Sequence, residues 1–363
     1  MPTIRIESWD LVAPGAPLAR AERSVDPEEL GEGEVLIEVA ACGVCHTDLG
    51  FAYDGVRTRH PLPLTLGHEI AGRVVHAGAG FAHLVGEAVI VPAVLPCGRC
   101  ALCEAGRGAV CREQVFPGND VHGGFASHVR VPGRGLCVVP RAALERGELD
   151  LIELAVIADA VTTPYQAVVN AGLKRGDLAI VVGAGGVGSF AVQIARALGA
   201  VVAAIDVDAG RLERASAHGA ELAVDARGDA RAIRAEIGKL AEARGVGGAG
   251  WKILECSGSP AGQELAFSLL GPDAHLGVVG YTREKVSLRL SNLMAFDATA
   301  RGTWGCLPAH YPAVLELVRK GDVVLGPFVE RRPMSRINET FEALRAHALT
   351  QRPVLIPDFR EAA

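Results

Sequence analysis

The chain has 363 residues, which is enough for two domains with separate hydrophobic cores. Hydrophobic residues make up 49% of the sequence and charged residues 21%, as in an ordinary soluble globular protein, and a formal net charge of −6 gives no reason to expect nucleic acid or an anionic membrane as a partner. No apolar run is long enough to span a bilayer, and the N-terminus lacks the pattern of a signal peptide, so we expect a cytoplasmic protein.

The N-terminal part, to about residue 155, is predicted to be mostly β. Short apolar runs punctuated by glycine and proline predict strands at 35–39, 69–76, 88–92, 129–131 and 136–139. The segment that follows, 153–171, predicts a helix with an interruption at Pro164.

Two segments of this part carry residue types that bind zinc. Residues 42–48 read CGVCHTD and residues 67–72 read GHEIAG. Cys45 and His68 supply a thiolate and an imidazole, which are ligand types of catalytic zinc. Glu69 could support the metal or become an extra ligand, and Asp48 could orient a ligand by hydrogen bonding. By themselves, one cysteine and one histidine also fit a buried thiol and a hydrogen-bonded imidazole without any metal.

A cluster of cysteines follows with the spacing C-x2-C-x2-C-x7-C. Its members are Cys97, Cys100, Cys103 and Cys111. In a reducing compartment such clustering indicates a metal rather than disulfides. An iron–sulfur cluster also uses four thiolates, but the spacing and the absence of a following proline favour a closed structural zinc site, which keeps no open position for chemistry.

From residue 178 onward, apolar strand-like runs alternate with helical patterns, which predicts an α/β fold with a doubly wound parallel sheet. The predicted strands are 178–182, 201–205, 221–224, 251–255 and 275–279, and the predicted helices are 230–243 and 261–269. A helix at 313–319 then leads into a further mixed segment.

A glycine-rich turn joins the first two of these strands. It reads GAGGVG and contains Gly183, Gly185, Gly186, Val187 and Gly188. The first glycine of the G-x-G-x-x-G pattern permits a tight turn, the second permits close approach of a pyrophosphate, and the third permits close helix–strand packing. The helix N-terminus then presents free N–H groups to the phosphates. The turn therefore predicts dinucleotide binding.

Asp206 ends the second strand, where a carboxylate can accept hydrogen bonds from a ribose 2′-hydroxyl and repel a 2′-phosphate. The sequence therefore favours NAD over NADP. Arg211 and Arg214 follow closely. They leave two interpretations open, because an arginine could accommodate a phosphate, while Arg211 could equally pack along the adenosine ribose.

The combination resembles the zinc-dependent medium-chain alcohol dehydrogenases over nearly the whole chain. The pieces that match are CHTD at 45–48, GHE at 67–69, the four-cysteine segment and GAGGVG at 183–188, in the order and spacing of that family. The resemblance implies a GroES-like catalytic domain at 1–160 and 308–363, with the structural zinc lobe at about 95–113. A Rossmann domain at 161–307 would interrupt it, with the active site in the cleft between them.

The resemblance also implies the roles of residues in the reaction. Hydride would pass between an alcohol and NAD, with one catalytic and one structural zinc ion per subunit. The catalytic ligands would be Cys45, His68 and Asp159, an aspartate where many relatives carry cysteine. Thr47 would take the substrate proton. The histidine that often ends this relay is replaced by Gly50, which leaves His46, Tyr53, His60 or bulk water as the exit.

Further cofactor contacts follow from the same resemblance. His46 would lie near the pyrophosphate, Thr163 at the nicotinamide end, Cys256 in a turn beside the adenosine, and Val279 at a strand end beside the carboxamide. The family is dimeric or tetrameric, often through the edges of its Rossmann sheets. A predicted strand at 286–290 could form such an edge.

The substrate is the least determined feature. Residues 51–69 are similar to the 6-hydroxycyclohex-1-ene-1-carbonyl-CoA dehydrogenases of anaerobic aromatic degradation, which implies a CoA thioester whose phosphates Arg57 and Arg59 could meet. The alternatives are an aliphatic, aromatic or polyol alcohol. A zinc-free quinone reductase is disfavoured by Cys45, His68 and the cysteine cluster. A non-catalytic NAD-binding protein is disfavoured by the set of Cys45, His68 and Asp159.

Overall fold

The computed structural model describes residues 2–359, and the chain divides into two compact units. The first unit contains the chain up to Asp159, Gly305–Arg319 and the part from Leu325 onward, and the second contains Ala160–Trp304 and Lys320–Val324. Across the residues described, no helix is both long and apolar enough to cross a bilayer.

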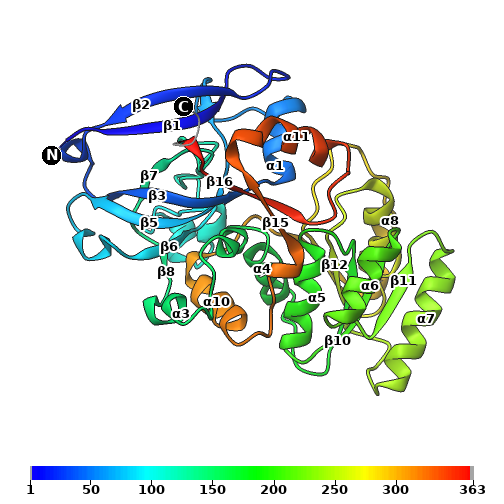
Figure 1. The fold of residues 1–363 in the computed structure, drawn as a ribbon. Helices are drawn as coiled ribbons and strands as arrows, with labels where there is room; N and C mark the ends of the chain where they lie inside the picture. Colours follow the sequence, from blue (N-terminus) through cyan, green and yellow to red (C-terminus); the bar gives the residue numbers. More distant parts are fainter. Residues whose placement is uncertain (1, 360–363) are drawn as a thin grey trace. The chain divides into compact units, whose positions relative to one another are not determined.

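The first unit is built around antiparallel β-sheet. Its strands are β1 (Ile4–Leu11), β2 (Ala19–Val25), β3 (Glu34–Gly43), β4 (Leu64–Thr65), β5 (Glu69–Ala77), β6 (Ala88–Val91), β7 (His128–Pro132), β8 (Cys137–Val138), β15 (Val329–Pro333) and β16 (Arg352–Ile356). One sheet has the order β2-β1-β4, and the other has the order β15-β16-β3-β5-β6-β8 with β7 also paired to β3. The C-terminal strands thus lie beside a strand from the start of the chain (Figure 1).

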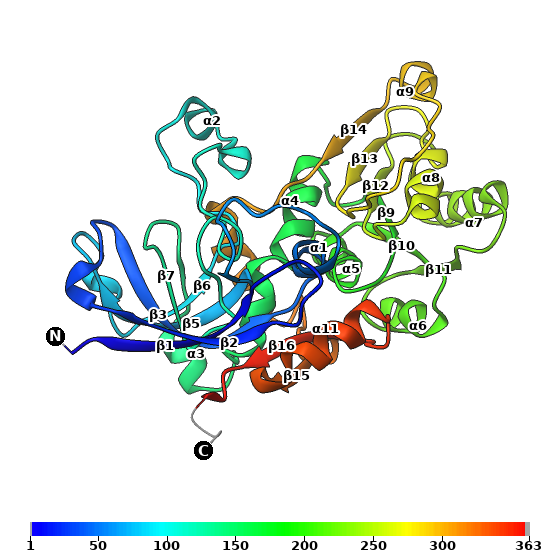
Figure 2. The ribbon, with the colours of Figure 1, turned by 90° about the horizontal axis from the view of Figure 1, so that it is seen from above.

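Short helices connect and cover these strands. They are α1 (His46–Tyr53), α2 (Ala101–Glu104), α3 (Arg141–Glu145), α10 (Tyr311–Arg319), α11 (Ile337–Arg345) and the 3-10 helix η4 (Glu153–Ala158). The four-cysteine lobe with α2 projects from the strands of this unit (Figure 2). Because the lobe contributes little to the apolar core of the unit, it needs a stabilising element of its own.

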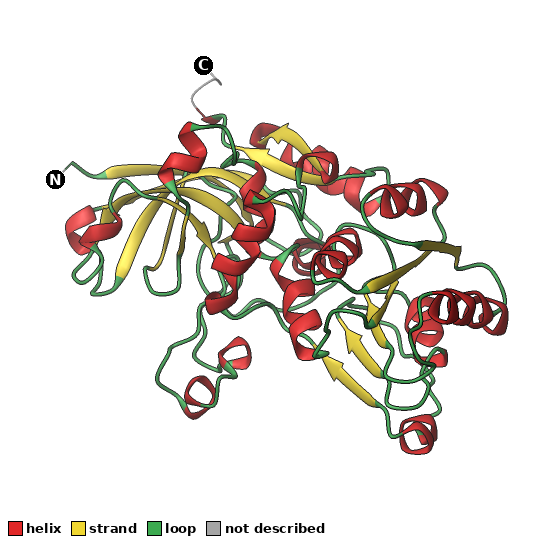
Figure 3. Cartoon of the chain, turned by 90° about the horizontal axis from the view of Figure 1, so that it is seen from below, coloured by secondary structure: helices red, strands yellow, loops and turns green. Residues whose placement is uncertain are grey.

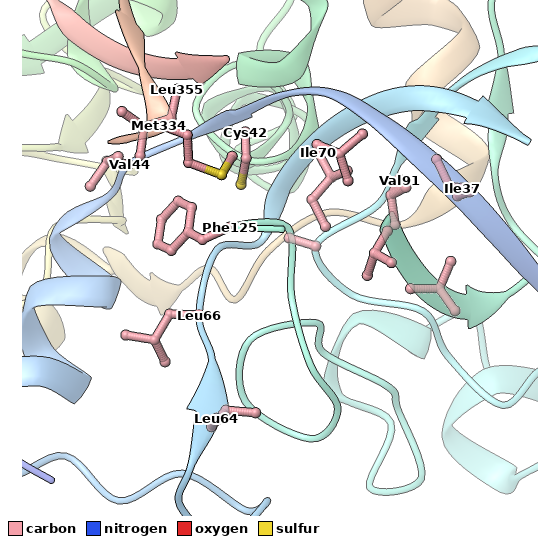
Figure 4. Packing of buried hydrophobic residues seen from close by; sticks show 14 of the residues in the cluster. Ile37, Cys42, Val44, Leu64, Leu66, Ile70, Val91, Phe125, Met334 and Leu355 are labelled. Atoms are coloured by element: carbon pink, nitrogen blue, oxygen red, sulfur yellow. The ribbon is translucent and has the colours of Figure 1, made fainter. Parts of the chain in front are cut away.

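The core of the first unit gathers residues from both ends of the chain. Phe125 is fully buried beside Cys42, Leu66, Met334 and Leu355, and the close view shows these side chains pointing toward one another (Figure 4). Alternating apolar residues of β3 and β5 supply much of the remainder. Packing from several elements therefore fixes the segment 64–70, which carries the candidate metal ligand His68.

The second unit is a six-stranded parallel sheet with helices on both faces (Figure 3). Its strands are β9 (Leu178–Val182), β10 (Val201–Asp206), β11 (Leu222–Asp225), β12 (Lys252–Glu255), β13 (His275–Val278) and β14 (Thr299–Gly302). Its helices are α4 (Thr162–Asn170), α5 (Gly188–Ala197), α6 (Ala209–Ala217), α7 (Ala230–Ala243), α8 (Pro260–Ser268) and α9 (Ser291–Phe296). The order β11-β10-β9-β12-β13-β14 is that of a Rossmann fold, which confirms the predicted α/β class.

Local sequence explains where several of these helices begin. Asp229 accepts hydrogen bonds from the N–H groups of Arg231 and Ala232 at the start of α7. Ser259 accepts from Gly262 N at the start of α8, and Pro260 occupies its first turn, where a missing N–H costs nothing.

Two predicted elements differ from the structure. The stretch 153–171 is not one interrupted helix, because η4 ends at Ala158 and α4 begins at Thr162. Pro164 lies in the first turn of α4, where proline is tolerated, so it does not break the helix. The stretch 286–290 is not a strand, and β14 at Thr299–Gly302 forms the edge of the sheet. An apolar alternation alone does not provide the neighbour that a strand must pair with.

Candidate active site

The first cluster of site residues forms where three segments of the first unit meet. Cys45 directly precedes α1, His68 precedes β5, and Asp159 follows η4. Gly67 has a φ of 93°, and a Cβ there would lie 2.8 Å from both Cys42 Sγ and the Phe125 ring, so only glycine allows this approach to His68.

Asp48 links two of these segments. One of its carboxylate oxygens accepts a hydrogen bond from Cys45 N at 2.9 Å, and the other accepts from Gly67 N at 3.2 Å and lies 3.4 Å from His68 Nδ1. The carboxylate is fully buried. It therefore orients the imidazole so that Nε2 faces the other candidate ligands, as expected for a histidine that binds a metal.

The distances between the donor atoms fit a metal. Asp159 Oδ2 lies 3.9 Å from Cys45 Sγ and 3.6 Å from His68 Nε2. With ligand bonds of about 2.0–2.3 Å, the edges of a zinc tetrahedron are roughly 3.3–3.8 Å long. Donor atoms of Cys45, His68, Glu69 and Asp159 all lie within 4.8 Å of one another. Three segments distant in sequence thus bring one thiolate, one imidazole and carboxylates together.

The charge at this site also favours a cation. Burial by itself lowers the pKa of His68, but the nearby Asp48 and Asp159 carboxylates raise this pKa well above its usual value. Glu69 is fully buried and pairs with Arg352 through both oxygens, with Arg352 Nε at 2.7 Å from Oε2. Arg352 therefore compensates Glu69 and leaves the thiolate and Asp159 for a metal ion.

Arg352 was not predicted from the sequence, and neither was the contact of Phe116, a residue of the expected substrate-pocket segment 116–122, with His68. Arg352 lies 283 positions after Glu69, and no local pattern connects the two. Phe116 packs on the metal-site imidazole, with 5.0 Å between its ring centroid and that of His68. The only signal in the sequence was Glu69, which directly follows the predicted ligand His68. A glutamate that is buried at such a position requires a cationic partner.

The residues of the predicted proton relay have identifiable surroundings. Thr47 Oγ1 lies 3.7 Å from Cys45 Sγ, in the first turn of α1. Tyr53 packs against Arg345, and the His60 ring lies 4.9 Å from that of His122. His46 is exposed and stacks on His347 at 6.2 Å. The proton acceptor role of Thr47 and the exit of the relay stay predictions.

The four cysteines of the lobe come together as a second cluster. The Sγ–Sγ distances are 3.9 Å for Cys97–Cys103, 3.6 Å for Cys100–Cys103 and 3.7 Å for Cys100–Cys111. Four thiolates at about 2.3 Å from one zinc ion would be about 3.8 Å apart. A disulfide would need about 2.05 Å. A backbone N–H and the neighbouring thiols lower the pKa of Cys100 to about 7, whereas burial raises the pKa of its neighbour Cys103 to about 11.

The glycine-rich turn lies in the second unit, where β9 leads into α5. A Cβ on Gly183 would lie 2.5 Å from Ser257 N, and one on Gly188 would lie 1.7 Å from Gly183 O. Gly185 instead faces open space, with only the Arg211 guanidinium near, 3.6 Å from a built Cβ. Gly183 and Gly188 are thus required by packing, whereas Gly185 leaves room for a ligand.

Asp206 is anchored beside this turn. Its carboxylate accepts hydrogen bonds from Ala184 N at 2.7 Å and Asp208 N at 2.9 Å, and Arg211 Nη1 lies 3.8 Å away. The side chain is 5% exposed at the carboxyl end of β10. This is the edge of a parallel sheet at which nucleotides bind.

The remaining predicted cofactor residues also belong to the second unit. Thr163 is buried in the first turn of α4, and Val279 N donates to Glu255 O at 2.9 Å at the end of β13. Burial raises the pKa of the Cys256 thiol, and its Cβ lies 3.2 Å from the position of a Cβ on Gly188. Cys256 is therefore suited to packing under the turn and not to nucleophilic chemistry.

Sequence comparison matches both units to known proteins. Residues 31–141 match the profile of the alcohol dehydrogenase GroES-like domain, and residues 186–320 match that of the zinc-binding dehydrogenases. An alcohol dehydrogenase of Geobacillus stearothermophilus is 30% identical over 340 residues, covering 93% of this chain and 96% of that protein. The chain belongs to the zinc-binding alcohol dehydrogenase family. It is accordingly an alcohol-type dehydrogenase, and the expected GroES-like and Rossmann folds are confirmed.

Solved structures of this family agree with the fold. Galactitol-1-phosphate dehydrogenase from Escherichia coli has a TM-score of 0.85 at 27% identity, covering 97% of this chain and all of that one. The alcohol dehydrogenase of Aeropyrum pernix has a TM-score of 0.84 at 30% identity with the same coverage. An L-threonine 3-dehydrogenase of Pyrococcus abyssi is 28% identical over 334 residues, covering 89% of this chain and 91% of that protein. These relatives differ in the alcohols that they are named for.

Proposed function

We propose that this dehydrogenase transfers a hydride between an alcohol and NAD, with a catalytic zinc ion held by Cys45, His68 and Asp159. The convergence of these three donors, with Asp159 Oδ2 at 3.6 Å from His68 Nε2 and 3.9 Å from Cys45 Sγ, is the observation that carries the proposal. A zinc ion held by three protein ligands supplies an open position at which the substrate oxygen is polarised.

The protein residues around this position have separate tasks. Asp48 holds the imidazole of His68 in the orientation that presents Nε2. Thr47 is the proposed acceptor of the substrate hydroxyl proton, and its Oγ1 lies 3.7 Å from Cys45 Sγ. Glu69 is fully buried, and its pairing with Arg352 compensates its charge. It would bind the zinc ion only as an additional ligand, after leaving Arg352. The exit of the proton beyond Thr47 involves His46, Tyr53, His60 or solvent.

We assign a second zinc ion to Cys97, Cys100, Cys103 and Cys111. The Sγ–Sγ distances of 3.6–3.9 Å support a single tetrahedral ion, and thiolates bound to separate irons of a cluster would lie farther apart. All four positions are occupied by thiolates, so the role of this zinc is to stabilise the lobe.

We propose NAD as the cofactor, bound along the turn formed by Gly183, Gly185, Gly186, Val187 and Gly188. A related zinc-binding dehydrogenase of Sinorhizobium meliloti 1021, with a TM-score of 0.83 and 26% identity over 98% of this chain and all of that one, has been solved with NADP. Family membership therefore does not choose between the two cofactors. The anchored carboxylate of Asp206 favours NAD, because a 2′-phosphate beside it would be repelled.

A simple or polyol alcohol is the first substrate class, in keeping with relatives named for alcohols, L-threonine and galactitol 1-phosphate. The thioester 6-hydroxycyclohex-1-ene-1-carbonyl-CoA is the second candidate and rests on the sequence of residues 51–69. Of its two proposed phosphate ligands, Arg57 is exposed, whereas Arg59 lies 3.5 Å from Asp120 and donates to Arg112 O at 3.4 Å. Arg59 would have to exchange these partners to bind CoA.

The experiment follows NADH absorbance with purified protein, NAD or NADP, and a panel of primary, secondary and polyol alcohols together with the thioester and its free acid. Turnover of simple alcohols with NAD, lost after removal of zinc by a chelator, is the expected result. Turnover of the thioester alone would reverse the order of the two substrate candidates. No turnover of any alcohol by zinc-loaded protein would contradict the proposed reaction.

We also propose that two subunits join through the edge strand β14. All four residues of β14 are exposed, and four large apolar side chains from the segments before and after this strand are 51–79% exposed, namely Tyr281, Leu290, Met294 and Trp304. Unpaired strand edges and clustered apolar residues are costly in isolated molecules. Pairing of two β14 edges would cover both.

A further inference from the structure

Glu255 is a buried acidic residue whose function the proposed reaction does not explain. It ends β12 at the carboxyl edge of the parallel sheet, and its surface is fully covered. Within residues 2–359, its Oε2 atom has no hydrogen-bond partner, whereas most buried carboxylate oxygens are paired. Burial of a carboxylate oxygen without a hydrogen bond destabilises the folded protein. The other contacts of Glu255 therefore indicate its role.

The other carboxylate oxygen organises the turn that follows β12. Glu255 Oε1 accepts hydrogen bonds from Ser257 N at 2.7 Å, Ser257 Oγ at 2.6 Å and Gly258 N at 3.1 Å. Ser257 Oγ in turn lies 3.0 Å from Ser259 Oγ, which caps α8. One oxygen atom therefore fixes the conformation of residues 256–258.

This turn is in direct contact with the glycine-rich turn. A Cβ on Gly183 would lie 2.5–2.8 Å from three atoms of Ser257, and one on Gly188 would lie 3.2 Å from Cys256 Cβ. Displacement of Ser257 or Cys256 would therefore be transmitted to the turn that is proposed to hold the pyrophosphate.

The same residue also fixes the end of β13. The backbone oxygen of Glu255 accepts hydrogen bonds from both Val279 N and Gly280 N at 2.9 Å. A Cβ on Gly280 would lie 2.2 Å from Gly258 N and 2.8 Å from Glu255 Oε2. The backbone of 279–280 is thus packed directly on the turn that the carboxylate holds.

We propose that Glu255 is a positioning residue for the dinucleotide, which locks the glycine-rich turn at 183–188 to the strand end at 279–280 through the turn at 256–258. It acts through these three segments and does not itself contact the cofactor. The proposal rests on the proposed function of this unit as the NAD-binding site.

The contacts also predict which property of the side chain matters. Burial raises the pKa of the Glu255 carboxyl, and the interactions with Ser257, Gly258 and the Gln263 amide only partly offset this increase. In the described part of the chain, no positively charged group is hydrogen-bonded to either oxygen of this carboxylate. A neutral side chain of the same shape that keeps an acceptor at the position of Oε1 therefore suffices.

The test compares E255Q with E255L, two substitutions of similar size. The amide oxygen of E255Q can accept the N–H groups of Ser257 and Gly258, whereas E255L leaves them without an acceptor in a buried position. Titration of the zinc-loaded protein with NADH, followed by fluorescence, measures cofactor affinity directly. We expect E255L to raise the Kd for NADH and the KM for NAD by at least about tenfold and E255Q to stay within about threefold of the wild type.

Two further measurements separate positioning from general stability. The KM for the alcohol, measured at saturating NAD, and kcat are expected to change by less than about threefold in E255L. E264Q, at an exposed position on α8, is the control and should match the wild type. A lower melting temperature for E255L with unchanged NADH affinity would overturn the proposal, as would equal losses in E255Q and E255L. Absence of NADH binding by the wild type would instead overturn the proposed function.

Discussion

Asp159 is the proposed third zinc ligand, at a position where the family resemblance implies a cysteine in many relatives. A carboxylate is a harder ligand than a thiolate, and with one thiolate fewer the three ligands carry the same formal charge but donate less electron density to the metal. Its Oδ2 atom lies 3.9 Å from Cys45 Sγ and 3.6 Å from His68 Nε2, so this single side chain would complete the proposed donor set.

We therefore expect D159N to lose zinc from this site, because the amide keeps the shape but not the charge. The zinc affinity and kcat/KM should fall by about 100-fold or more, since ligand loss exceeds the roughly 10- to 100-fold effect of removing a residue beside a ligand. D159C should retain zinc because it restores a thiolate. Metal analysis after dialysis, together with kcat/KM, checks both variants. A D159N variant with full zinc content and activity would show that Asp159 is not a ligand.

The buried pair of Glu69 and Arg352 illustrates why single residues in such sites cannot be replaced independently. Both side chains are almost completely buried, at 0% and 7% exposed, and each compensates the charge of the other. Removal of one partner leaves an unpaired buried charge, which typically costs about 3–5 kcal/mol.

At the scale of single elements, the four-cysteine lobe is the segment for which we propose dependence on a single metal ion. Its helix α2 has four residues and no buried side chain, so the lobe has little apolar surface to hold it together. Structural zinc sites often supply the folding free energy of such segments directly.

We expect C103S to release one zinc ion per subunit and to unfold the lobe locally. Hydrogen exchange should increase at about 95–113 and remain as in the wild type elsewhere in the first unit. The control is C137S, which changes a buried cysteine outside the lobe and should keep the zinc content. Full zinc content in C103S, measured by a colorimetric chelator, would contradict the assignment of this ligand set.

A second element-scale feature joins β1, β4 and the loop that carries His122. Asp10 accepts a hydrogen bond from Thr65 Oγ1 at 2.6 Å, and Thr65 N donates to His122 Nδ1 at 3.2 Å. This bond requires an unprotonated Nδ1. Burial, together with the positive charge of Arg23, lowers the pKa of His122 to about 4. The network thus stabilises the strand before His68 only while His122 is neutral.

The stability of the protein should consequently depend on pH through His122. Its folded-state pKa is below the unfolded value of about 6.5, so the unfolded chain binds more protons between about pH 4 and pH 6.5. Stability is then lost as the pH falls through this range. H122Q keeps an acceptor for Thr65 N but cannot be protonated. Urea unfolding at several pH values should show a smaller acid loss in H122Q, and equal slopes for both proteins would refute this role.

At the scale of the whole molecule, the parallel sheet ends in two edge strands within the described chain, β11 and β14, and β14 is the proposed subunit contact. Thr299 N and Thr303 N donate to Ala274 O and Val278 O of the β13 side at 2.9 Å. Because N–H groups alternate in direction along a strand, those of Ala300 and Gly302 point to the open edge. The N–H groups of Ala300 and Gly302 are therefore the donors of β14 that could pair with a second subunit.

We expect A300P to abolish dimer formation, because proline removes an outward donor without removing a hydrogen bond to β13. A300V keeps the N–H group and serves as the control, with unchanged mass expected. Light scattering coupled to size-exclusion chromatography measures both. Wild-type mass in A300P would exclude β14 pairing as the subunit contact.

The sequence by itself determined the features that depend on local pattern. The alternation of strands and helices predicted the α/β fold, and the G-x-G-x-x-G turn predicted the start of α5, because each depends on residues close together in the chain. The same local reasoning was wrong at 153–171, where two separate helices replace the predicted single one. It was also wrong at 286–290, where the predicted strand is absent.

Only the tertiary structure decided which distant residues meet. Arg352 reaches Glu69 across 283 positions, Phe116 packs on His68, and the turn that Glu255 holds contacts both the glycine-rich turn and Gly280. Such contacts produce no periodic pattern in the sequence. They join residues that come together only in the folded chain, where buried charges need partners and backbones approach closely. The sequence indicated the candidate ligands by their residue types, whereas the residues that orient these side chains or compensate their charge became visible only in the packed structure.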